Sequence, residues 1–392
     1  MTKILLHDEQ LSLIKNHNKV ASYLSKEFSS RLFLKLSPEG ILLLIRGTSG
    51  AYRLEVPVET HLVDSQYISV DFGKWMSALD KFSYSDTLEL SLDKSFLSLG
   101  TGNSFDTINL GISKYDASSS EASIVDQYVA DELGKIQEGG EKLELTDSLM
   151  QDLSLAASLF LSQSDTNAIG LGKEDTIYSD RLTVLKIKHA DPIDPSLFSN
   201  EANLDTGYIT LHKYLVGLFG LISPLNPIVY VNDLYDVFGW SDSSSSLIIT
   251  SEPCEIQLPT EEEFQGIIPP ETASSFSAPL SSFRKGISFF QGFYDGNVWQ
   301  PIEFLVKKDS GVDLHFSGSS AELLKPLADV STPNSDAAFV LSAEILEKIV
   351  YKAISRFGED ALLTLRYDDK APGVYGNIAG VYEASFANLQ LG

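Results

Sequence analysis

The most constraining feature of this chain is one pattern of segments that occurs three times. A β-branched strand, a helix of about three turns, a polar turn and two further strands can be read in residues 67–102, 208–242 and 339–376. The copies begin at Tyr67, Tyr208 and Phe339, which stand 141 and 131 residues apart. That spacing is far longer than the roughly 20–50 residues of a solenoid repeat, so it predicts three similar domains.

The hydrophobic periodicity within each copy changes as this pattern requires. In the first copy, Trp75, Leu79 and Phe82 fall on one helical stripe, and Leu88 and Leu90 then alternate as in a strand. A second helix, followed by a hairpin, precedes the three copies at residues 8–24, 148–161 and 279–293. The expected fold class is therefore α+β, with three repeated domains in which two helices pack on two antiparallel sheets.

Two stretches interrupt the repeats and are predicted to be linkers. Residues 121–142 are rich in Ser, Glu and Gly, with a short helix expected from Ile124 to Leu133, and residues 263–278 combine prolines with acidic charge. The predicted division of the chain is domain 1 at 1–120, a linker at 121–142, domain 2 at 143–262, a linker at 263–278, and domain 3 at 279–392.

Composition limits the class of protein. The 29 Lys and Arg residues against 54 Asp and Glu residues give a net charge of −25, which argues against a protein that coats DNA but leaves room for a confined basic track. The one cysteine, Cys254, excludes an intrachain disulfide and favours a reducing cytoplasm. No apolar stretch approaches the roughly 18–20 residues that cross a bilayer, so we expect no membrane partner.

The sequence contains no recognisable catalytic or metal-binding constellation. It has no G-x-x-x-x-G-K-[ST] phosphate loop and no G-x-S-x-G nucleophile elbow. The six histidines include no H-x-H or H-x-x-x-H pair, which are typical spacings for metal ligands on a strand or helix. We therefore expect no enzyme activity, no cofactor and no metal.

The informative charges are cations on the expected helices. Lys348, Lys352 and Arg356 recur every four residues and project from one helix face, opposite an apolar stripe. An ordinary solvated helix face would explain any one of these helices; several such helices in an acidic protein favour contact with a polyanion. The full set of candidate DNA-facing residues is Lys15, Lys19, Lys74, Lys81, Lys213, Arg284, Lys285, Lys348, Lys352 and Arg356.

The chain resembles the bacterial and phage type of DNA polymerase sliding clamp, the β-clamp or processivity factor. Residues 68–110, the hairpin 175–187 and the segment from Phe339 to the last strand carry the resemblance, which spans nearly the whole chain by pattern more than by identity. The resemblance implies a head-to-tail homodimer that encircles double-stranded DNA, with helices lining the hole. It also implies a DNA polymerase and a clamp loader ATPase as partners, in a bacterial cytoplasm or in the host cytoplasm if the chain is viral.

The family binds partner peptides in a hydrophobic pocket between its second and third domains. Carried over by position, the hairpin residues Ile177, Ser179, Arg181 and Leu182 form one wall, although Ile177 and Leu182 suit a buried hairpin core equally well. Pro227 falls near another pocket position, and Phe386, Leu389 and Leu391 form the rim at the C-terminus. The Gly-His of the family hairpin is missing here, and NLQLG replaces the more polar family tail.

The resemblance also implies a subunit seam that joins an edge strand of the first domain to one of the third. Phe105 matches an apolar family residue on the first-domain strand, and Ile287 and Phe289 would meet it from the third domain. Phe289 suits a domain core as well. Pairing of two edges would satisfy strands that otherwise stay open to aggregation.

Two other classes of protein remain as alternatives. A viral structural or carbohydrate-binding protein could use repeated β-rich domains for assembly, but it would have no reason to keep Lys348, Lys352 and Arg356 turned toward a common cavity. An enzyme of unknown type is disfavoured by the absence of a nucleophile–base or metal constellation.

Overall fold

The computed structural model divides the chain into two compact units, and every strand pairing within them is antiparallel. Unit 1 comprises residues 1–146 and 218–252, and unit 2 comprises residues 147–217 and 253–392. The structure describes residues 2–25, 31–47, 50–60, 62–82, 85–101, 106–115, 121–159, 167–180, 183–198, 206–250, 257–293, 301–317, 322–368 and 373–387.

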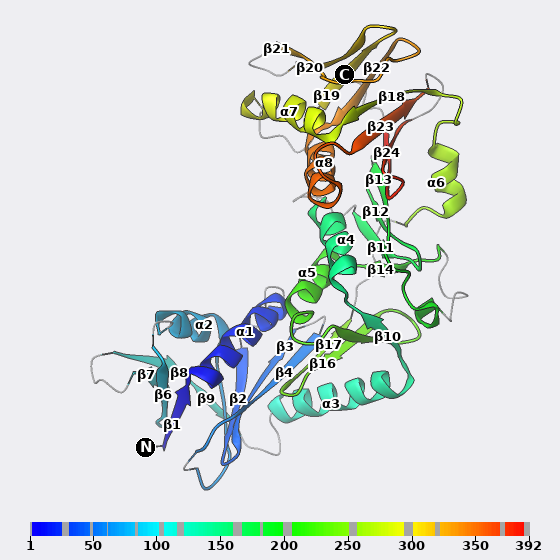
Figure 1. The fold of residues 1–392 in the computed structure, drawn as a ribbon. Coiled ribbons are helices and arrows are strands. Elements are labelled where there is room, and N and C mark those ends of the chain that lie inside the picture. The colour runs from blue at the N-terminus through cyan, green and yellow to red at the C-terminus, as the bar shows by residue number, and fades with distance from the viewer. Residues whose placement is uncertain are drawn as a thin grey trace. The chain divides into compact units, whose positions relative to one another are not determined.

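Unit 1 contains a four-stranded sheet in the order β1-β6-β7-β8 and a nine-stranded sheet in the order β10-β15-β16-β17-β4-β3-β2-β5-β9 (Figure 1). Its helices are α1 (Asp8–Ser25), α2 (Phe72–Lys81) and α3 (Glu121–Gly139). Its strands are β1 (Thr2–His7), β2 (Arg31–Ser37), β3 (Gly40–Arg46), β4 (Gly50–Pro57), β5 (Gln66–Asp71), β6 (Thr87–Leu92), β7 (Phe96–Gly100), β8 (Thr107–Gly111), β9 (Ser113–Tyr115), β10 (Glu141–Glu144), β15 (Ile228–Val231), β16 (Val237–Ser241) and β17 (Ser245–Thr250).

Unit 2 contains an eight-stranded sheet in the order β14-β11-β12-β13-β25-β24-β23-β18 and a four-stranded sheet in the order β21-β20-β19-β22. Its helices are α4 (Asp147–Ser158), α6 (Glu261–Ile267), α7 (Leu280–Phe290) and α8 (Ala343–Phe357), and α5 (Lys213–Ile222) contributes residues to both units. Its strands are β11 (Ala168–Leu171), β12 (Asp175–Ser179), β13 (Thr183–Lys188), β14 (Ile209–Leu211), β18 (Ser274–Pro279), β19 (Pro301–Lys307), β20 (Gly311–Ser317), β21 (Glu322–Pro326), β22 (Ala337–Ser342), β23 (Leu362–Tyr367), β24 (Gly373–Ile378) and β25 (Tyr382–Ala387).

The predicted repeat is present as strand, helix and two strands in each third of the chain. The three copies are β5-α2-β6-β7, β14-α5-β15-β16 and β22-α8-β23-β24. The apolar stripes that were read as core are buried: Trp75 and Leu79 on α2, and Ile349 and Val350 on α8, are at most 2% exposed. The α+β prediction is confirmed, and so are the additional helices expected before each copy, which are α1, α4 and α7.

Local capping explains where the helices of the repeat begin and end. The Asp71 side chain accepts a hydrogen bond from the Lys74 amide at the start of α2. The Ser342 side chain caps α8 in the same way at Ile345. The helix α8 ends at Gly358, whose φ of 87° lies in the region that L-residues other than glycine avoid.

The sheets continue from one third of the chain into the next. In unit 1, β17 of the middle third pairs with β4 of the first, with Leu247 opposite Tyr52. In unit 2, β13 of the middle third pairs with β25 of the last, with Leu185 opposite Ala384. The middle third therefore shares a sheet with each of its neighbours in the chain, which the repeat pattern did not reveal.

The first predicted linker is largely a helix that packs on a sheet. The helix α3 runs from Glu121 to Gly139, beyond the short helix expected at Ile124 to Leu133. Its residues Val125, Val129, Leu133 and Ile136 share a buried cluster with Leu44, Ile248 and other sheet residues. The boundaries of the domains remain a prediction, but this segment is an integral part of unit 1.

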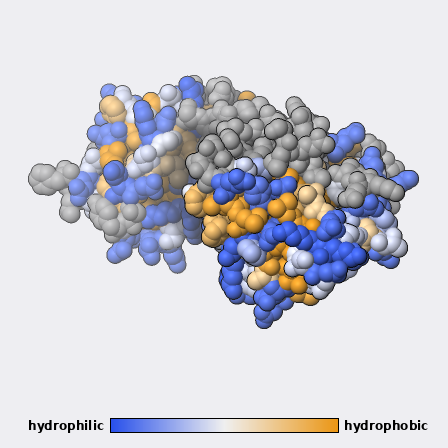
Figure 2. Space-filling model, turned by 90° about the horizontal axis from the view of Figure 1, so that it is seen from above, coloured by the Kyte–Doolittle hydropathy of each residue, from blue (hydrophilic) through white to orange (hydrophobic). Residues whose placement is uncertain are grey.

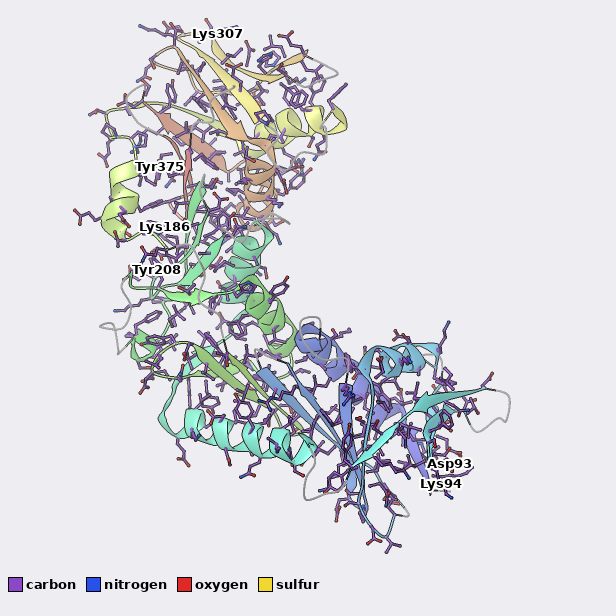
Figure 3. The ribbon with its side chains drawn as sticks, turned by 180° about the vertical axis from the view of Figure 1, so that it is seen from behind. Asp93, Lys94, Lys186, Tyr208, Lys307 and Tyr375 are labelled. Atoms are coloured by element: carbon purple, nitrogen blue, oxygen red, sulfur yellow. The ribbon has the colours of Figure 1, made fainter. Side chains whose placement is uncertain are left out.

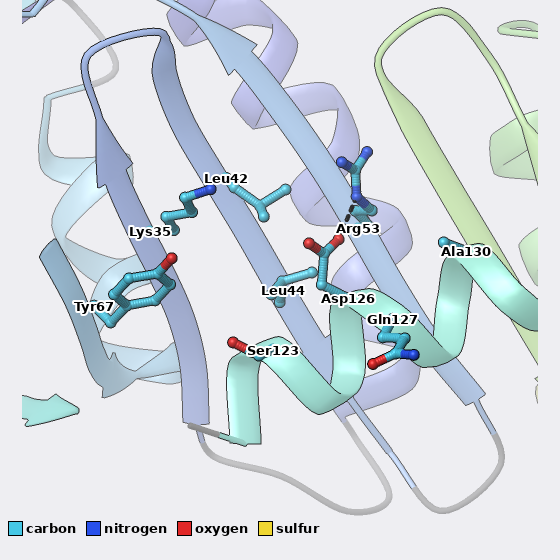
Figure 4. A pocket seen from close by; sticks show the side chains of 9 residues that line it. All are labelled: Lys35, Leu42, Leu44, Arg53, Tyr67, Ser123, Asp126, Gln127 and Ala130. Carbon is cyan, nitrogen blue, oxygen red and sulfur yellow. Dashed lines mark hydrogen bonds and ion pairs between the residues drawn. The ribbon is translucent and has the colours of Figure 1, made fainter. Parts of the chain in front are cut away.

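Strand β3 shows why a helix is needed on this side of the sheet. Its residues Gly40 to Ile45 are all buried, which is typical of a strand covered on both faces. Leu42 and Leu44 lie on the face covered by α3 (Figure 4), whereas Leu43 and Ile45 are buried on the opposite face, where α1 packs. The continuous apolar run GILLLIR is therefore the sequence signal for α3 as a cover.

The second predicted linker, residues 263–278, overlaps the short helix α6 and the strand β18, and α6 contacts the eight-stranded sheet through Lys186. Thr260 and Glu263 form a capping box at its start. Lys186 of β13 is 7% exposed, forms an ion pair with Glu261, and lies with its Nζ atom 5.0 Å from the ring centre of Phe264. Figure 3 labels Lys186 and the neighbouring Tyr208 on this side of the unit. Among the described residues, no helix combines the length and the apolar character needed to cross a membrane.

Candidate nucleic-acid interface and partner sites

The helices α1 and α2 present lysines on the side away from the core of unit 1. Lys19, Lys74 and Lys81 are exposed, and Lys15 is half-buried. None of the four forms an ion pair with a residue that the structure describes. On α2 the opposite stripe, which includes Trp75, is fully buried, so the lysines cannot turn inward. Whether these four lysines face DNA remains a prediction.

The helices α7 and α8 of unit 2 pack side by side, and polar pairs mark their antiparallel register. From one end of the seam to the other, the pairs are Gln291 with Glu347, Ser288 with Tyr351, and Arg284 with Glu359. We call this line of contacts the α7–α8 seam. Lys285 follows Arg284 on α7, and Lys352 follows Tyr351 on α8.

The cations at the α7–α8 seam are not equivalent. Arg284 Nη2 lies 2.7 Å from Glu359 Oε1, and Lys348 Nζ lies 2.7 Å from Glu344 Oε1 on the same helix face. Lys285 and Lys352 are exposed and pair with no described residue. A phosphate would therefore find its least neutralised partners at Lys285 and Lys352.

Arg356, the third predicted cation of α8, is bound to α4. Its guanidinium forms an ion pair with Asp152 and lies over the rings of Phe357 and Tyr382, at 5.5 and 5.6 Å from their centres. Asp152 is 1% exposed, and burial raises its pKa to about 6 against the opposing effect of Arg356. The structure therefore removes Arg356 from the set of free cations and makes it a link between α4 and α8.

The middle third contributes little positive charge on its helices. The segment of α4 from Asp147 to Ser158 contains no Lys or Arg, and on α5 Lys213 stands alone at the first position. The side chain of Lys213 lies outside the described residues. Among the described residues, the helical lysines without an ionic partner therefore lie in the first and last thirds.

The predicted partner-peptide pocket remains a prediction, and the structure shows the surroundings of only some of its residues. Ile177 is 0% exposed in a core cluster with Ala168 and Leu258. Its side chain therefore lies in the hairpin core. Ser179, predicted for the wall, and Phe386, predicted for the C-terminal rim, are also buried, at 4% and 3% exposure. Arg181, Leu182, Leu389 and Leu391 lie outside the described residues. Pro227 is exposed just before β15 and belongs to unit 1.

The two four-stranded sheets each end in a strand with one unpaired edge. β8 pairs only with β7, and β21 pairs only with β20, among the strands that the structure describes. Leu324 on β21 is 55% exposed, and Phe289 on α7 and Phe293 shortly after α7 are 45% and 41% exposed. Figure 2 shows hydrophobic surface on the side of unit 2 that is turned to the viewer.

The residues predicted for the subunit seam separate into two groups. Ile287 is 1% exposed and packs in the core of unit 2, so it is not available to a partner subunit. Its neighbour Phe289 faces solvent, with Lys325 Nζ of β21 5.2 Å from its ring centre. Phe105 lies outside the described residues. The sequence analysis missed Phe293 and Leu324, because neither follows the helical stripe that it used.

Unit 1 also contains a cavity of about 250 Å³ between α3 and the sheet (Figure 4). Leu42, Leu44 and Tyr67 line it together with Arg53, which forms ion pairs with Asp126 and Glu55. The charges in this cavity are thus largely neutralised by one another. They present no arrangement of nucleophile and base.

Within the described part of the chain, no cluster of three or more His, Cys, Asp or Glu residues is placed to hold a metal ion. His315 lies between two carboxylates, with Nδ1 2.7 Å from Glu303 and Nε2 3.3 Å from Glu322. The hydrogen bond to Glu303 is the main reason why the His315 pKa is raised. This group links β19, β20 and the edge strand β21.

No family model matches the chain. Solved structures match it along the whole length: a putative DNA polymerase III beta subunit from Eubacterium rectale ATCC 33656 has a TM-score of 0.68 at 8% identity, covering 100% of both chains. The DNA polymerase III beta subunit of Thermotoga maritima and the DNA polymerase sliding clamp of Bacillus subtilis both have TM-scores of 0.67, at 10% and 9% identity, with the same coverage. The chain therefore has the three-domain β-clamp fold, as its sequence predicted.

Proposed function

We propose that this protein is a DNA sliding clamp: two copies close head to tail around double-stranded DNA and tether a replicative polymerase. The full-length match to β-clamp structures is the observation that carries the proposal. A clamp holds DNA by topological linkage, so it needs no base recognition and no catalytic groups. Its contacts are non-specific contacts to phosphate.

The distribution of charge supports this function. The chain has a net charge of −25, yet α1, α2, α7 and α8 keep exposed lysines that have no described ionic partner. In a ring with helices toward the hole, Lys19, Lys74 and Lys81 would face DNA from one domain, and Lys285 and Lys352 from another. The acidic remainder of the surface would repel DNA from the outside of the ring.

The open sheet edges support a head-to-tail dimer. β8 of the first third and β21 of the last third each lack a partner on one side within the described chain. Pairing of β8 with β21 of a second copy would close two such seams and cover Leu324, Phe289 and Phe293. Burial of three large apolar side chains at each seam would favour association, since each contributes about 1.5–3 kcal/mol when fully buried.

The polymerase and an ATP-driven loader would bind through a peptide pocket near the hairpin after β12. Arg181, Leu182, Leu389 and Leu391 remain the predicted contacts, and Pro227 remains a separate prediction in unit 1. Ile177, Ser179 and Phe386 would support the pocket from beneath, because their side chains are buried. The site of action would be the cytoplasm of a bacterium or of the host of a phage.

The proposal is tested by particle mass and by retention on DNA. Light scattering at micromolar concentration should give about 86 kDa, twice the 43.0 kDa chain, and Leu324→Asp should shift the particle toward the monomer mass. The double variant Lys285→Glu/Lys352→Glu should leave nicked circular DNA faster than the wild type after loading. A monomeric wild type, or equal retention of the wild-type and reversed proteins, would contradict the ring or its DNA path.

A further inference from the structure

The centre of the α7–α8 seam contains two neutral hydroxyl groups that are joined by only a long, weak hydrogen bond. Tyr351 of α8 is 43% exposed, and Ser288 of α7 is half-buried. The Ser288 Oγ atom and the Tyr351 phenolic oxygen are 3.5 Å apart, at the outer limit of a hydrogen bond and well beyond the usual 2.7–2.8 Å between hydroxyls. Either O–H group can therefore turn to a better acceptor at low cost.

Cations lie within one helical turn of these hydroxyls. Lys285 precedes Ser288 by three residues on α7, and Lys348 precedes Tyr351 by three residues on α8, so each lysine shares a face with its hydroxyl residue. Lys352 is adjacent to Tyr351 in sequence and is exposed. The surroundings of the hydroxyl pair thus favour an anion.

The carboxylates of the α7–α8 seam already have partners. Glu359 pairs with Arg284, Glu344 pairs with Lys348, and the Glu347 carboxylate accepts a hydrogen bond from Gln291. Lys285, Lys352 and Glu347 have no described ionic partner, so two free cations stand against one free carboxylate beside the loosely associated hydroxyls. A further ligand at the seam would therefore be a negatively charged group that accepts hydrogen bonds.

We propose that Ser288 and Tyr351 form a phosphate-binding position on the α7–α8 seam, where their hydroxyls donate to DNA backbone oxygens between Lys285 and Lys352. The inference rests on the proposed function. It adds neutral hydrogen-bond donors to the predicted DNA-facing residues, which the sequence identified by their positive charge alone. Ser and Tyr hydroxyls are common phosphate ligands in protein–DNA complexes. Tyrosine has two side-chain torsions, so it holds its hydroxyl in place with less loss of freedom than a lysine does.

A salt series separates the contribution of a neutral donor from that of a charge. Binding of the wild type, Tyr351→Phe, Ser288→Ala and Lys352→Ala to a short linear duplex, which a closed ring can thread, is measured by fluorescence anisotropy at several salt concentrations. Tyr351→Phe and Ser288→Ala should each weaken binding about 2- to 13-fold, the loss of one hydrogen bond, with the slope of log K against log[salt] unchanged. Lys352→Ala should reduce that slope by about 0.9 for each phosphate contact that is lost, of which the dimer offers one per copy.

Tyr67→Phe is the matched control, because it removes a tyrosine hydroxyl from the sheet side of unit 1, beside α3. The control should bind like the wild type, and circular dichroism melts should show that all variants are folded. If both hydroxyl variants bind like the wild type while Lys352→Ala is weakened, the phosphate position is overturned and the clamp function stands. If the wild type itself does not bind the duplex at low salt, the phosphate position is overturned, whereas the clamp function is decided by particle mass and by retention on circular DNA. Equal weakening in Tyr67→Phe and Tyr351→Phe also overturns the assignment.

Discussion

Replacing Arg356 with methionine is expected to destabilise the contact between α4 and α8, because the change leaves the Asp152 carboxylate buried without a counter-charge. Asp152 is 1% exposed, and its pKa is raised from 3.8 to about 6 even with the guanidinium beside it. At 1.36 kcal/mol per pKa unit, that rise corresponds to a cost of about 3 kcal/mol for holding the charged form at neutral pH. Without Arg356 the carboxyl can take up a proton instead, so the pH-dependent part of the loss at pH 7 is limited to about one further pKa unit, or about 1.4 kcal/mol, in addition to the lost contacts of the guanidinium.

The dependence on pH follows from the direction of the Asp152 shift. A group whose pKa is higher in the folded than in the unfolded state stabilises the protein fully below the unfolded value, and that stabilisation is lost as pH rises through the folded value. For Asp152, the window of loss runs from about 3.8 to about 6. Without Arg356 the folded pKa rises further, so Arg356→Met should be much closer to wild type at pH 5 than at pH 7.

Urea unfolding followed by circular dichroism at pH 5 and pH 7 measures both effects. Protein concentration is held constant, because dimer formation would otherwise shift the midpoint. The matched control is the double variant Asp152→Asn/Arg356→Met, in which no charge is left buried, and it should recover most of the stability lost at pH 7. A double variant as unstable as Arg356→Met, or a loss that is equal at the two pH values, would refute the reasoning.

Three further changes probe other parts of the fold. Leu133→Ala on α3 should cost about 2–5 kcal/mol in urea unfolding, since Leu133 is 8% exposed in the cluster that joins α3 to the sheet; a cost under about 0.5 kcal/mol would show that α3 is not an integral cover. Gly170→Ala should destabilise by about 1–3 kcal/mol in the same assay, because its Cβ would lie 2.5 Å from Leu258 Cδ1 and 2.7 Å from Ile177 Cγ2; an unchanged midpoint would mean that these side chains yield freely. The pKa of His315 is raised by Glu303, so its contribution to stability is present below pH 6.5 and is lost as pH rises through the folded value; His315→Gln should remove that part of the pH profile, and identical profiles would exclude the effect.

The repeat and its core were determined by the sequence, because hydrophobic periodicity is a local property of a segment. Trp75 and Leu79 on α2, like Ile349 and Val350 on α8, are buried as their spacing required. The apolar run of β3 also carried a local signal, since a strand with buried residues at every position needs cover on both faces. That signal shows that β3 needs a covering element, but not which segment supplies it. The segment that contains α3 was therefore predicted to be a linker with only a short helix.

Which helical cations lack an ionic partner could be predicted only in part, because the partner of a charged side chain depends on tertiary contacts. Lys352 and Arg356 occupy equivalent positions on one face of α8, and nothing in their spacing distinguishes them. The fold places the buried carboxylate of Asp152, 204 residues away in the chain, beside Arg356 and leaves Lys352 in solvent. Spacing along a helix fixes which face a side chain shares, whereas the packing of α4 against α8 decides whether its charge remains available.

The joining of strands from different thirds into continuous sheets was likewise decided by tertiary structure alone. β17 and β4 pair across nearly two hundred residues of chain, and so do β13 and β25, through backbone hydrogen bonds that carry little sequence information. Hydrophobic alternation identifies each of these strands and the face that it buries. It does not identify the neighbouring strand, because any edge with free N–H and C=O groups offers the same bonds, and only the packing of whole domains selects one.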